Sequence, residues 1–242
     1  MIKYYKHILL DLDRTLWDMD KNSYETMQEL FAKYISIKPE VVCSFDEFWK
    51  QYTPINDALW EGMRNGTVDK QQLRYERIKQ TLIALHIDEL FSANQINKIG
   101  LEYTNTAPLK TNLVSNALEL LQYLKKQKYT LHIITNGFKK SQVTKLKQCN
   151  IAHYFKHIIT SEDLGVSKPH LRFFTATLNL IKANANECLV IGDDLAIDCE
   201  GAANAGIDSV WFDYLETNKH IEYTTIKRIT HLSELIVSPN LS

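Results

Sequence analysis

The sequence predicts an α/β protein in which a doubly wound parallel sheet is interrupted by an insertion made only of helices. Beyond about residue 113, short apolar segments alternate with segments of helical pattern, which is typical of a parallel sheet with helices on both faces. Residues 18 to 106 contain several helix-start signals but no convincing strand. One apolar strand, at about Lys6–Leu12, precedes this stretch and is expected to join the later strands in the same sheet.

These observations predict two domains. Residues 1–17 and 107–242 form an α/β core domain, and residues 18–106 form an all-helical domain inserted after the first strand. The sequence shows no internal repeat and no low-complexity segment that would indicate another architecture.

The helical insertion is expected to contain about five helices. Four polar residues are followed three positions later by Glu or Gln, as in a capping box; these pairs are Asn22 with Glu25, Ser44 with Glu47, Asp69 with Gln72 and Ser92 with Gln95. Thr53-Pro54 predicts a further start, because proline is favoured at the first helical position. Gly66 is expected to end that helix.

The elements of the core alternate along the chain. Strands are expected at Tyr129–Thr135, His157–Thr160, Cys188–Ile191, Ser209–Phe212 and Thr224–Ile229. Helices are expected at Ser115–Gln127, Lys139–Cys149, Pro169–Ile181, Ala196–Ala205 and His231–Ile236. The helix at 196–205 is expected to stop at Gly206.

Composition excludes several classes of protein. Among 242 residues, 45% are hydrophobic and the net charge is −1, which is ordinary for a globular protein and argues against a nucleic-acid polymer as partner. No apolar run approaches the about 20 residues of a membrane span, and acids interrupt any signal-like segment at the N-terminus. The four cysteines form no metal or disulfide pattern, as expected in a reducing compartment. We therefore expect a cytoplasmic protein, a monomer or small homo-oligomer, that acts on a small molecule.

Asp11 and Asp13 are the first candidates for chemistry. They directly follow the apolar strand, and ligand sites in open α/β sheets lie beyond the carboxyl ends of the strands. Two carboxylates at such a place are costly to desolvate unless a cation compensates them. An Mg²⁺ site with one carboxylate acting as nucleophile explains the pair, although an ordinary acidic loop would show the same two residues.

Polar residues also follow three later elements of the core. Thr135, Asn136 and Gly137 end a strand and offer a hydroxyl and backbone N–H groups for a phosphate. Lys168 offers a positive charge, and Asp193 offers a further oxygen ligand for Mg²⁺. Each feature alone is a common turn or helix entry. Their occurrence in this order, at positions that a doubly wound sheet brings together, predicts a phosphoryl-transfer site.

Four segments in this order resemble the motifs of the haloacid dehalogenase (HAD) superfamily. Asp11–Thr15 matches D-x-D-x-T, Ile133–Gly137 matches a strand ending in Thr or Ser, Ser167–Pro169 matches a lysine often followed by proline, and Gly192–Gly206 matches G-D-x-x-x-D with a trailing G-A-x-x-A-G. The resemblance covers nearly the whole chain. It implies a Rossmann-like parallel-sheet core with an inserted C1-type helical cap.

Within this superfamily, Asp13–Asp18 and Ile134–Gly137 are most similar to the cytosolic 5′-nucleotidases of the YjjG type. The resemblance implies a phosphatase that uses Mg²⁺, held by Asp11, by the backbone carbonyl of Asp13 and by Asp193. Asp11 would form an aspartyl-phosphate, and Asp13 would act as general acid and then as general base.

The remaining site residues would stabilise the charge of the phosphoryl group. Lys168, Thr135 and the N–H groups of Asn136 and Gly137 would contact its oxygens. Asp194 stands where the family frequently has Ser or Thr. Which of Asp193, Asp194 and Asp198 would bind the metal directly therefore stays open.

Several functions are compatible with these motifs. The favoured function is hydrolysis of nucleoside 5′-monophosphates; a sugar-phosphate or phosphoglycolate-like phosphatase, or a phosphomutase, would carry the same core residues. A haloacid dehalogenase is disfavoured by Asp13, because that chemistry requires no protonation of the leaving group. A non-catalytic binding protein is disfavoured because every expected catalytic group is present.

Overall fold

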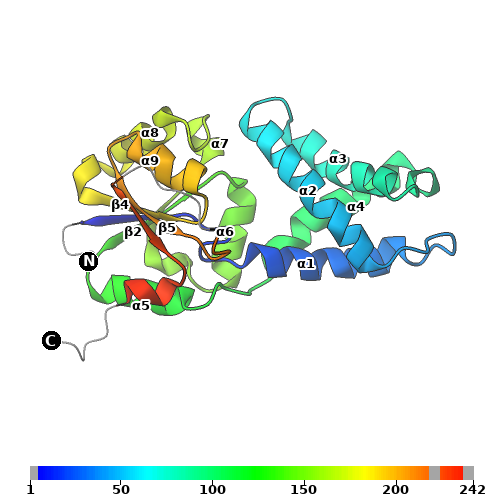
Figure 1. The fold of residues 1–242 in the computed structure, drawn as a ribbon, viewed down its shortest axis with the longest axis horizontal. Coiled ribbons are helices and arrows are strands. Elements are labelled where there is room, and N and C mark those ends of the chain that lie inside the picture. The colour runs from blue at the N-terminus through cyan, green and yellow to red at the C-terminus, as the bar shows by residue number, and fades with distance from the viewer. Residues whose placement is uncertain (1–4, 218–223, 237–242) are drawn as a thin grey trace. The chain divides into compact units, whose positions relative to one another are not determined.

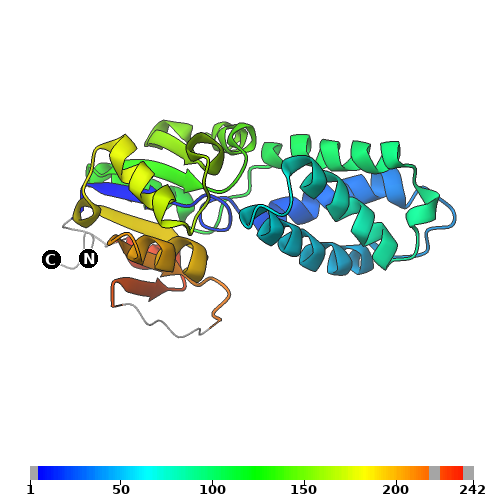
Figure 2. The same cartoon turned by 90° about the horizontal axis from the view of Figure 1, so that it is seen from above.

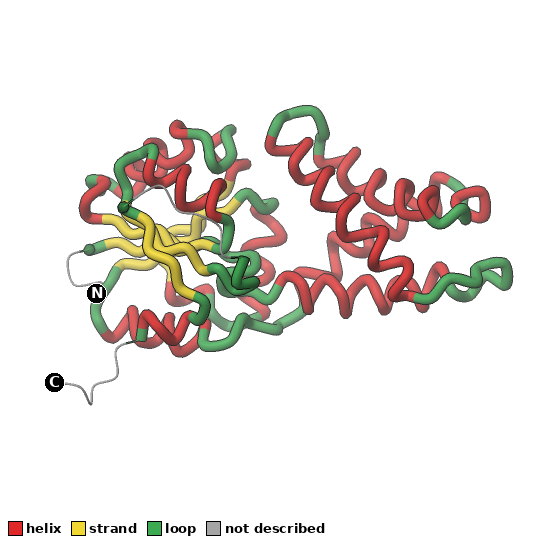
Figure 3. Tube along the Cα trace, viewed as in Figure 1, coloured by secondary structure: helices red, strands yellow, loops and turns green. Residues whose placement is uncertain are grey.

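The computed structural model describes residues 5–217 and 224–236 and divides into two compact units. The first unit is Met1–Met19 with Thr111–Ser242, and the second is Asp20–Lys110. The ends of the predicted core domain, 1–4 and 237–242, lie outside the described residues. In the described residues all strands belong to the first unit, and the second consists of helices and loops (Figure 3).

The first unit is built on a parallel sheet, which confirms the predicted fold class. Its strands lie in the order β3-β2-β1-β4-β5-β6. They are β1 His7–Leu10, β2 Thr130–Thr135, β3 Phe155–Thr160, β4 Cys188–Gly192, β5 Asp208–Phe212 and β6 Ile226–Ile229. Figure 2 shows β1, in blue, in the interior of the sheet. The direction of strand addition reverses between β1 and β4, and sites in doubly wound sheets lie at such a switch point.

Helices cover both faces of this sheet. Figure 1 shows α5 on one face and α8 on the other. The helices of this unit are α5 Ala117–Lys126, α6 Lys139–Gln148, α7 Ser161–Leu164, α8 Leu171–Ile181 and α9 Gly201–Ala203, the last preceded by a π-helical segment, Leu195–Glu200. The short α7 was not predicted; Thr160 caps it together with Asp163. The predicted helix at 231–236 is only a 3₁₀ turn, Leu232–Leu235.

Alternate residues of β1 serve the two faces. Ile8 belongs to a buried cluster that includes Leu120 of α5, whereas Leu9 belongs to a second cluster that includes Phe173 of α8. All four side chains are fully buried. Because successive side chains of a strand point to opposite faces, one short strand anchors both layers and is held rigidly at its carboxyl end.

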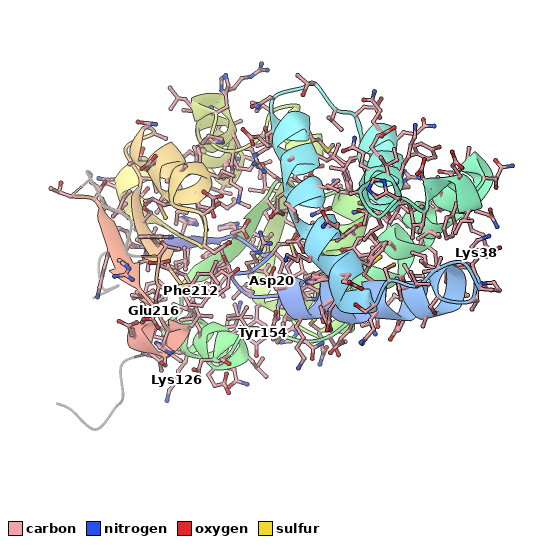
Figure 4. The ribbon with its side chains drawn as sticks, turned by 45° about the vertical axis from the view of Figure 1, so that its right-hand side comes forward. Asp20, Lys38, Lys126, Tyr154, Phe212 and Glu216 are labelled. Carbon is pink, nitrogen blue, oxygen red and sulfur yellow. The ribbon has the colours of Figure 1, made fainter. Side chains whose placement is uncertain are left out.

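The second unit contains four α-helices with their own apolar core. They are α1 Met19–Leu30, α2 Phe45–Arg64, α3 Lys70–Ala84 and α4 Ala93–Thr106. A π-helical turn, Phe31–Ile35, continues α1. Figure 4 labels Asp20 near the start of α1 and Lys38 beyond this turn. The buried core includes Phe48, Tyr52, Ile78 and Ile99.

Three of the predicted helix starts are confirmed. Ser44, Asp69 and Ser92 each accept a backbone N–H through the side chain and form complete capping boxes. Gly66 has a φ of +74° just after the end of α2, which suits a stop that only glycine adopts readily.

Two predicted starts are wrong, and the second of them, at Thr53-Pro54, explains why four α-helices replace the expected five. Asn22 lies inside α1, where it is fully buried. Pro54 lies inside α2 and starts nothing. The buried residues Phe48, Tyr52, Asn56 and Leu59 continue the helical spacing past the proline. Packing of this face keeps α2 continuous although Pro54 lacks an N–H.

Candidate active site

Two carboxylates follow the two strands at the switch point. Asp11 comes directly after β1, and Asp193 directly after β4. The Asp11 backbone N–H donates to Ile191 O at 2.9 Å, which extends the pairing of β1 with β4 beyond the end of the strand. The turn after Asp11 is closed by Trp17 N–H donating to Leu12 O at 2.8 Å. Asp11 and Asp193 are therefore placed side by side by the sheet itself.

Lys168 lies at the centre of the predicted site. Its Nζ donates to Asp11 Oδ1 and to Asp198 Oδ1, each at 2.6 Å, and to the backbone oxygen of Ile134 at 3.0 Å. The residue is only 2% exposed. An ammonium has three donors, and all three are used here. Lys168 thus joins the segment after β1, the end of β2 and the segment after β4.

Asp11, Asp193 and Asp198 form a group of carboxylates. Each offers one oxygen, and these three oxygens lie within 4.8 Å of one another. Burial raises the pKa of the Asp11 carboxyl to about 7, against the opposing effect of Lys168. Burial, together with Asp11 and Asp198, raises the pKa of Asp193 well above its usual value. Although burial alone would lower it, the two carboxylates raise the pKa of Lys168, which stays charged.

Three acids around one ammonium favour a bound cation. A hard divalent ion such as Mg²⁺ prefers oxygen ligands, and this donor set consists of carboxylate oxygens. The residues present therefore fit a metal.

The aspartates after β4 differ in what their side chains already contact. Asp198, 2% exposed, accepts from Lys168 on Oδ1 and from the backbone N–H of Asp194 on Oδ2, at 3.2 Å. Asp194 is exposed and accepts the Ile197 N–H at 3.0 Å, as the cap of the π-helical segment. Within the described part of the chain, the Asp193 carboxylate accepts one side-chain hydrogen bond, from the Thr15 hydroxyl at 3.1 Å. Asp193 is therefore the one best able to accept a new ligand.

Asp13 is held apart from this group. Its Oδ1 accepts from Lys145 Nζ at 2.5 Å, and its Oδ2 accepts from Gln142 Nε2 at 3.0 Å. Its carboxylate does not belong to the Asp11–Asp193–Asp198 group. The two aspartates of the first motif thus have different surroundings, Asp11 against Lys168 and Asp13 against the side chains of α6.

The segment after β2 is shaped by two short-range contacts. Thr135 is 2% exposed, and its Oγ1 accepts the backbone N–H of Gly137 at 3.0 Å. The Asn136 side chain pairs with the backbone of Lys168, donating from Nδ2 at 2.9 Å and accepting on Oδ1 at 2.8 Å. The Asn136 amide thus holds Lys168 in place. The Thr135 hydroxyl accepts in its contact with Gly137, so its own hydrogen can be donated to a ligand.

The structure gathers Asp11, Asp193 and Lys168 with Asp198, and it holds the Asp13 side chain apart against α6. Gln142 and Lys145, which hold Asp13, were not among the residues that the sequence proposed. No sequence signal identified these two, because α6 contains four lysines and resembles a solvated helix. A third addition is Ser161, whose hydroxyl donates to the backbone oxygen of Asn136 at 3.1 Å.

A family model described as haloacid dehalogenase-like hydrolase matches residues 8–212. The pyrimidine 5′-nucleotidase PynA of Streptococcus pneumoniae is 30% identical over 224 residues, 90% of this chain and 88% of the relative. The pyrimidine 5′-nucleotidase YjjG of Escherichia coli is 26% identical over 85% of each chain. A glyceraldehyde 3-phosphate phosphatase of Pyrococcus abyssi is 38% identical over 46% of this chain and 47% of the relative.

Solved structures show the same fold. The HAD-hydrolase YfnB of Bacillus subtilis, bound to magnesium, has a TM-score of 0.80 and 26% identity over 96% of each chain. The 2-haloacid dehalogenase of Pseudomonas syringae, at 22% identity and a TM-score of 0.64, supports the fold alone. Among the described helices, none has the length and apolar character needed to cross a membrane.

Proposed function

The chain belongs to the haloacid dehalogenase-like hydrolase family, and we propose that it is an Mg²⁺-dependent phosphatase that hydrolyses nucleoside 5′-monophosphates through an aspartyl-phosphate. The observation that carries this proposal is that the carboxylates of Asp11 and Asp13 have different hydrogen-bond partners. Asp11 is bound to Lys168 beside two further carboxylates, whereas Asp13 is held by Lys145 and Gln142. One acid is therefore placed for attack and the other for proton transfer.

The metal would be held by the carboxylates of Asp11 and Asp193 and by the backbone carbonyl of Asp13. When bound, it supplies positive charge that offsets the negative charge of the phosphate. Asp198 would contribute by holding Lys168, since both of its oxygens already accept hydrogen bonds.

Asp11 is the proposed nucleophile. Lys168 binds its Oδ1 at 2.6 Å, and its Oδ2 makes no hydrogen bond within the described residues. The free oxygen would attack phosphorus and form a mixed anhydride with release of the alcohol. Lys168, the Thr135 hydroxyl and the backbone N–H groups near Gly137 would stabilise the phosphoryl oxygens.

Asp13 is the proposed acid and base. It would give a proton to the departing alkoxide and then take one from the water that hydrolyses the aspartyl-phosphate. This water attack restores the Asp11 carboxylate and releases inorganic phosphate.

The substrate class is supported by the extent of the similarities. The two pyrimidine 5′-nucleotidases match along 85% or more of this chain, whereas the glyceraldehyde 3-phosphate phosphatase matches over 46%. We propose that the helical unit 20–110 is the cap that selects the leaving group. A sugar phosphate is the second candidate, because the glyceraldehyde 3-phosphate phosphatase of Pyrococcus abyssi is 38% identical over 46% of this chain.

A phosphate-release screen with Mg²⁺ tests this function. The panel would contain purine and pyrimidine nucleoside 5′-monophosphates, sugar phosphates and phosphoglycolate. We expect the highest kcat/KM with pyrimidine nucleotides and no turnover after chelation of the metal. A higher kcat/KM with sugar phosphates than with every nucleotide would reject nucleotides as the substrate class in favour of sugar phosphates. Substantial Mg²⁺-dependent turnover by Asp11→Asn would exclude Asp11 as nucleophile.

A further inference from the structure

The Asp13 side chain is held by two residues of one helix. Gln142 and Lys145 are separated by three positions in α6, so both lie on the same face of that helix. Lys145 Nζ donates to Oδ1 of Asp13 at 2.5 Å, and Gln142 Nε2 donates to Oδ2 at 3.0 Å. Each oxygen of the carboxylate therefore has its own donor.

Both donors are buried, which is unusual for their residue types. Gln142 is 2% exposed and Lys145 is 7% exposed, whereas Lys147 on the same helix is exposed to solvent. Burial of an ammonium is costly unless it is paired, and Asp13 is the carboxylate within salt-bridge distance of Lys145 in the described chain. Burying this ammonium beside Asp13 therefore costs desolvation free energy, which the ion pair offsets.

Lys145 also lies over the ring of Trp17, with Nζ 4.0 Å from the ring centroid. Trp17 is 1% exposed, and its backbone oxygen accepts the N–H of Arg14 at 2.9 Å within the same turn that carries Asp13. The face of an indole ring attracts a cation. The indole ring therefore gives the ammonium a second contact on the turn that carries Asp13.

Gln142 connects Asp13 to the segment proposed to bind phosphate. A Cβ atom on Gly137 would lie 1.9 Å from Gln142 Nε2, so the amide passes through space that only glycine leaves open. The other end of the amide, Oε1, is buried and has no hydrogen-bond partner among the described residues. Gln142 therefore links the Asp13 carboxylate to the turn at Gly137.

We propose that Lys145 and Gln142 are positioning residues that hold Asp13 in the orientation needed for its acid and base steps. The inference rests on the proposed function, because it assumes that Asp13 transfers protons. Neither side chain is required to touch the substrate. Their removal should slow the steps in which a proton moves and leave the binding of the phosphate nearly unchanged.

Steady-state kinetics with a series of aryl phosphates and one nucleotide test this proposal. The dinitrophenolate leaving group departs without a proton, whereas phenolate and a nucleoside alkoxide require one. We expect Lys145→Met to lower kcat about tenfold to a hundredfold with phenyl phosphate and the nucleotide, and about twofold or less with dinitrophenyl phosphate. KM should stay within about twofold throughout. Lys147→Met, an exposed lysine on the same helix, is the matched control and should behave as wild type.

Three results separate the possible failures. If wild type hydrolyses none of these esters, the proposed function fails. If Asp13→Asn shows the dependence on the leaving group and Lys145→Met does not, only the positioning role fails. An equal loss of kcat with every ester, or a loss confined to KM, would also overturn it. Should Lys145→Met not fold, as judged by circular dichroism, the isosteric Gln142→Glu must show the same selective loss or the proposal is rejected.

Discussion

Mg²⁺ and protons should compete for the carboxylates around Lys168, and this competition can be measured as protein stability. Burial raises the pKa of Asp11 from 3.8 to about 7. Between these pH values the native protein holds a proton that the unfolded chain has released. The free energy of unfolding of the metal-free protein therefore falls as the pH rises through this window.

The magnitude follows from the size of the shift. One titrating group changes the free energy of unfolding by about 1.4 kcal/mol per pH unit. Over the window from 3.8 to about 7 this amounts to about 4 kcal/mol for Asp11. Mg²⁺ removes the penalty of ionisation, and at a hundredfold excess over its Kd it should stabilise the protein by about 2.7 kcal/mol. At pH 5 the gain should be smaller, because protons must first leave the site.

Urea unfolding at several pH values, with chelator and with Mg²⁺, measures both effects. Other groups titrate in the same window; His132, whose pKa is lowered to about 3 chiefly by burial, contributes with the opposite sign. The informative quantity is therefore the difference between wild type and Asp11→Asn, which retains the shape of the site but cannot ionise. Calorimetric titration with Mg²⁺ in two buffers of different ionisation enthalpy would count the protons released.

The expected result is a difference that grows toward pH 7 in chelator and a Mg²⁺ affinity that rises with pH. Equal Mg²⁺ stabilisation at pH 5 and pH 8 would refute the reasoning, because it would mean that no proton leaves the carboxylates on binding. A stability difference between wild type and Asp11→Asn that is independent of pH would refute the raised pKa.

Two further predictions concern local packing. Gly192→Ala would place a Cβ 2.3 Å from Asp198 Oδ2 and displace the side chain that holds Lys168. We expect the free energy of unfolding, measured in urea, to fall by about 1–3 kcal/mol and kcat to fall as well. Unchanged stability and kcat would show that the Asp198 side chain can move without cost. Ser44→Ala removes the capping box of α2 and should cost about 1 kcal/mol in the free energy of unfolding, whereas Ser36→Ala, which loses only a 3.4 Å hydroxyl contact, should cost less.

Local patterns in the sequence predicted the features that depend on neighbouring residues. The capping boxes at Ser44, Asp69 and Ser92 were found because their donors and acceptors lie within four residues of one another. The strand before Asp11 was found because its apolar run has no polar interruption. Pro54 was misread for the same reason, since the local signal for a start was present and the buried face that continues α2 was not visible locally.

The order of the chemical groups along the chain was also readable from the sequence. Asp11 and Asp193 directly follow β1 and β4, Thr135 ends β2 and Lys168 precedes α8. A doubly wound sheet brings the carboxyl ends of its strands together. The sequence alone therefore predicted a phosphoryl-transfer site and named the residues proposed to compose it.

Only the tertiary structure decided how these groups are held. The contacts of Asp13 with Gln142 and Lys145 span 129 and 132 positions of the chain. Nothing local distinguishes Lys145 from the exposed Lys147, because both lie in a lysine-rich helix. Likewise Asp198 became the anchor of Lys168, and Asp194 a helix cap, through contacts set by the packing of β4 and the π-helical segment. Burial and partner choice at this site arise from long-range packing, which residue types and spacing do not encode.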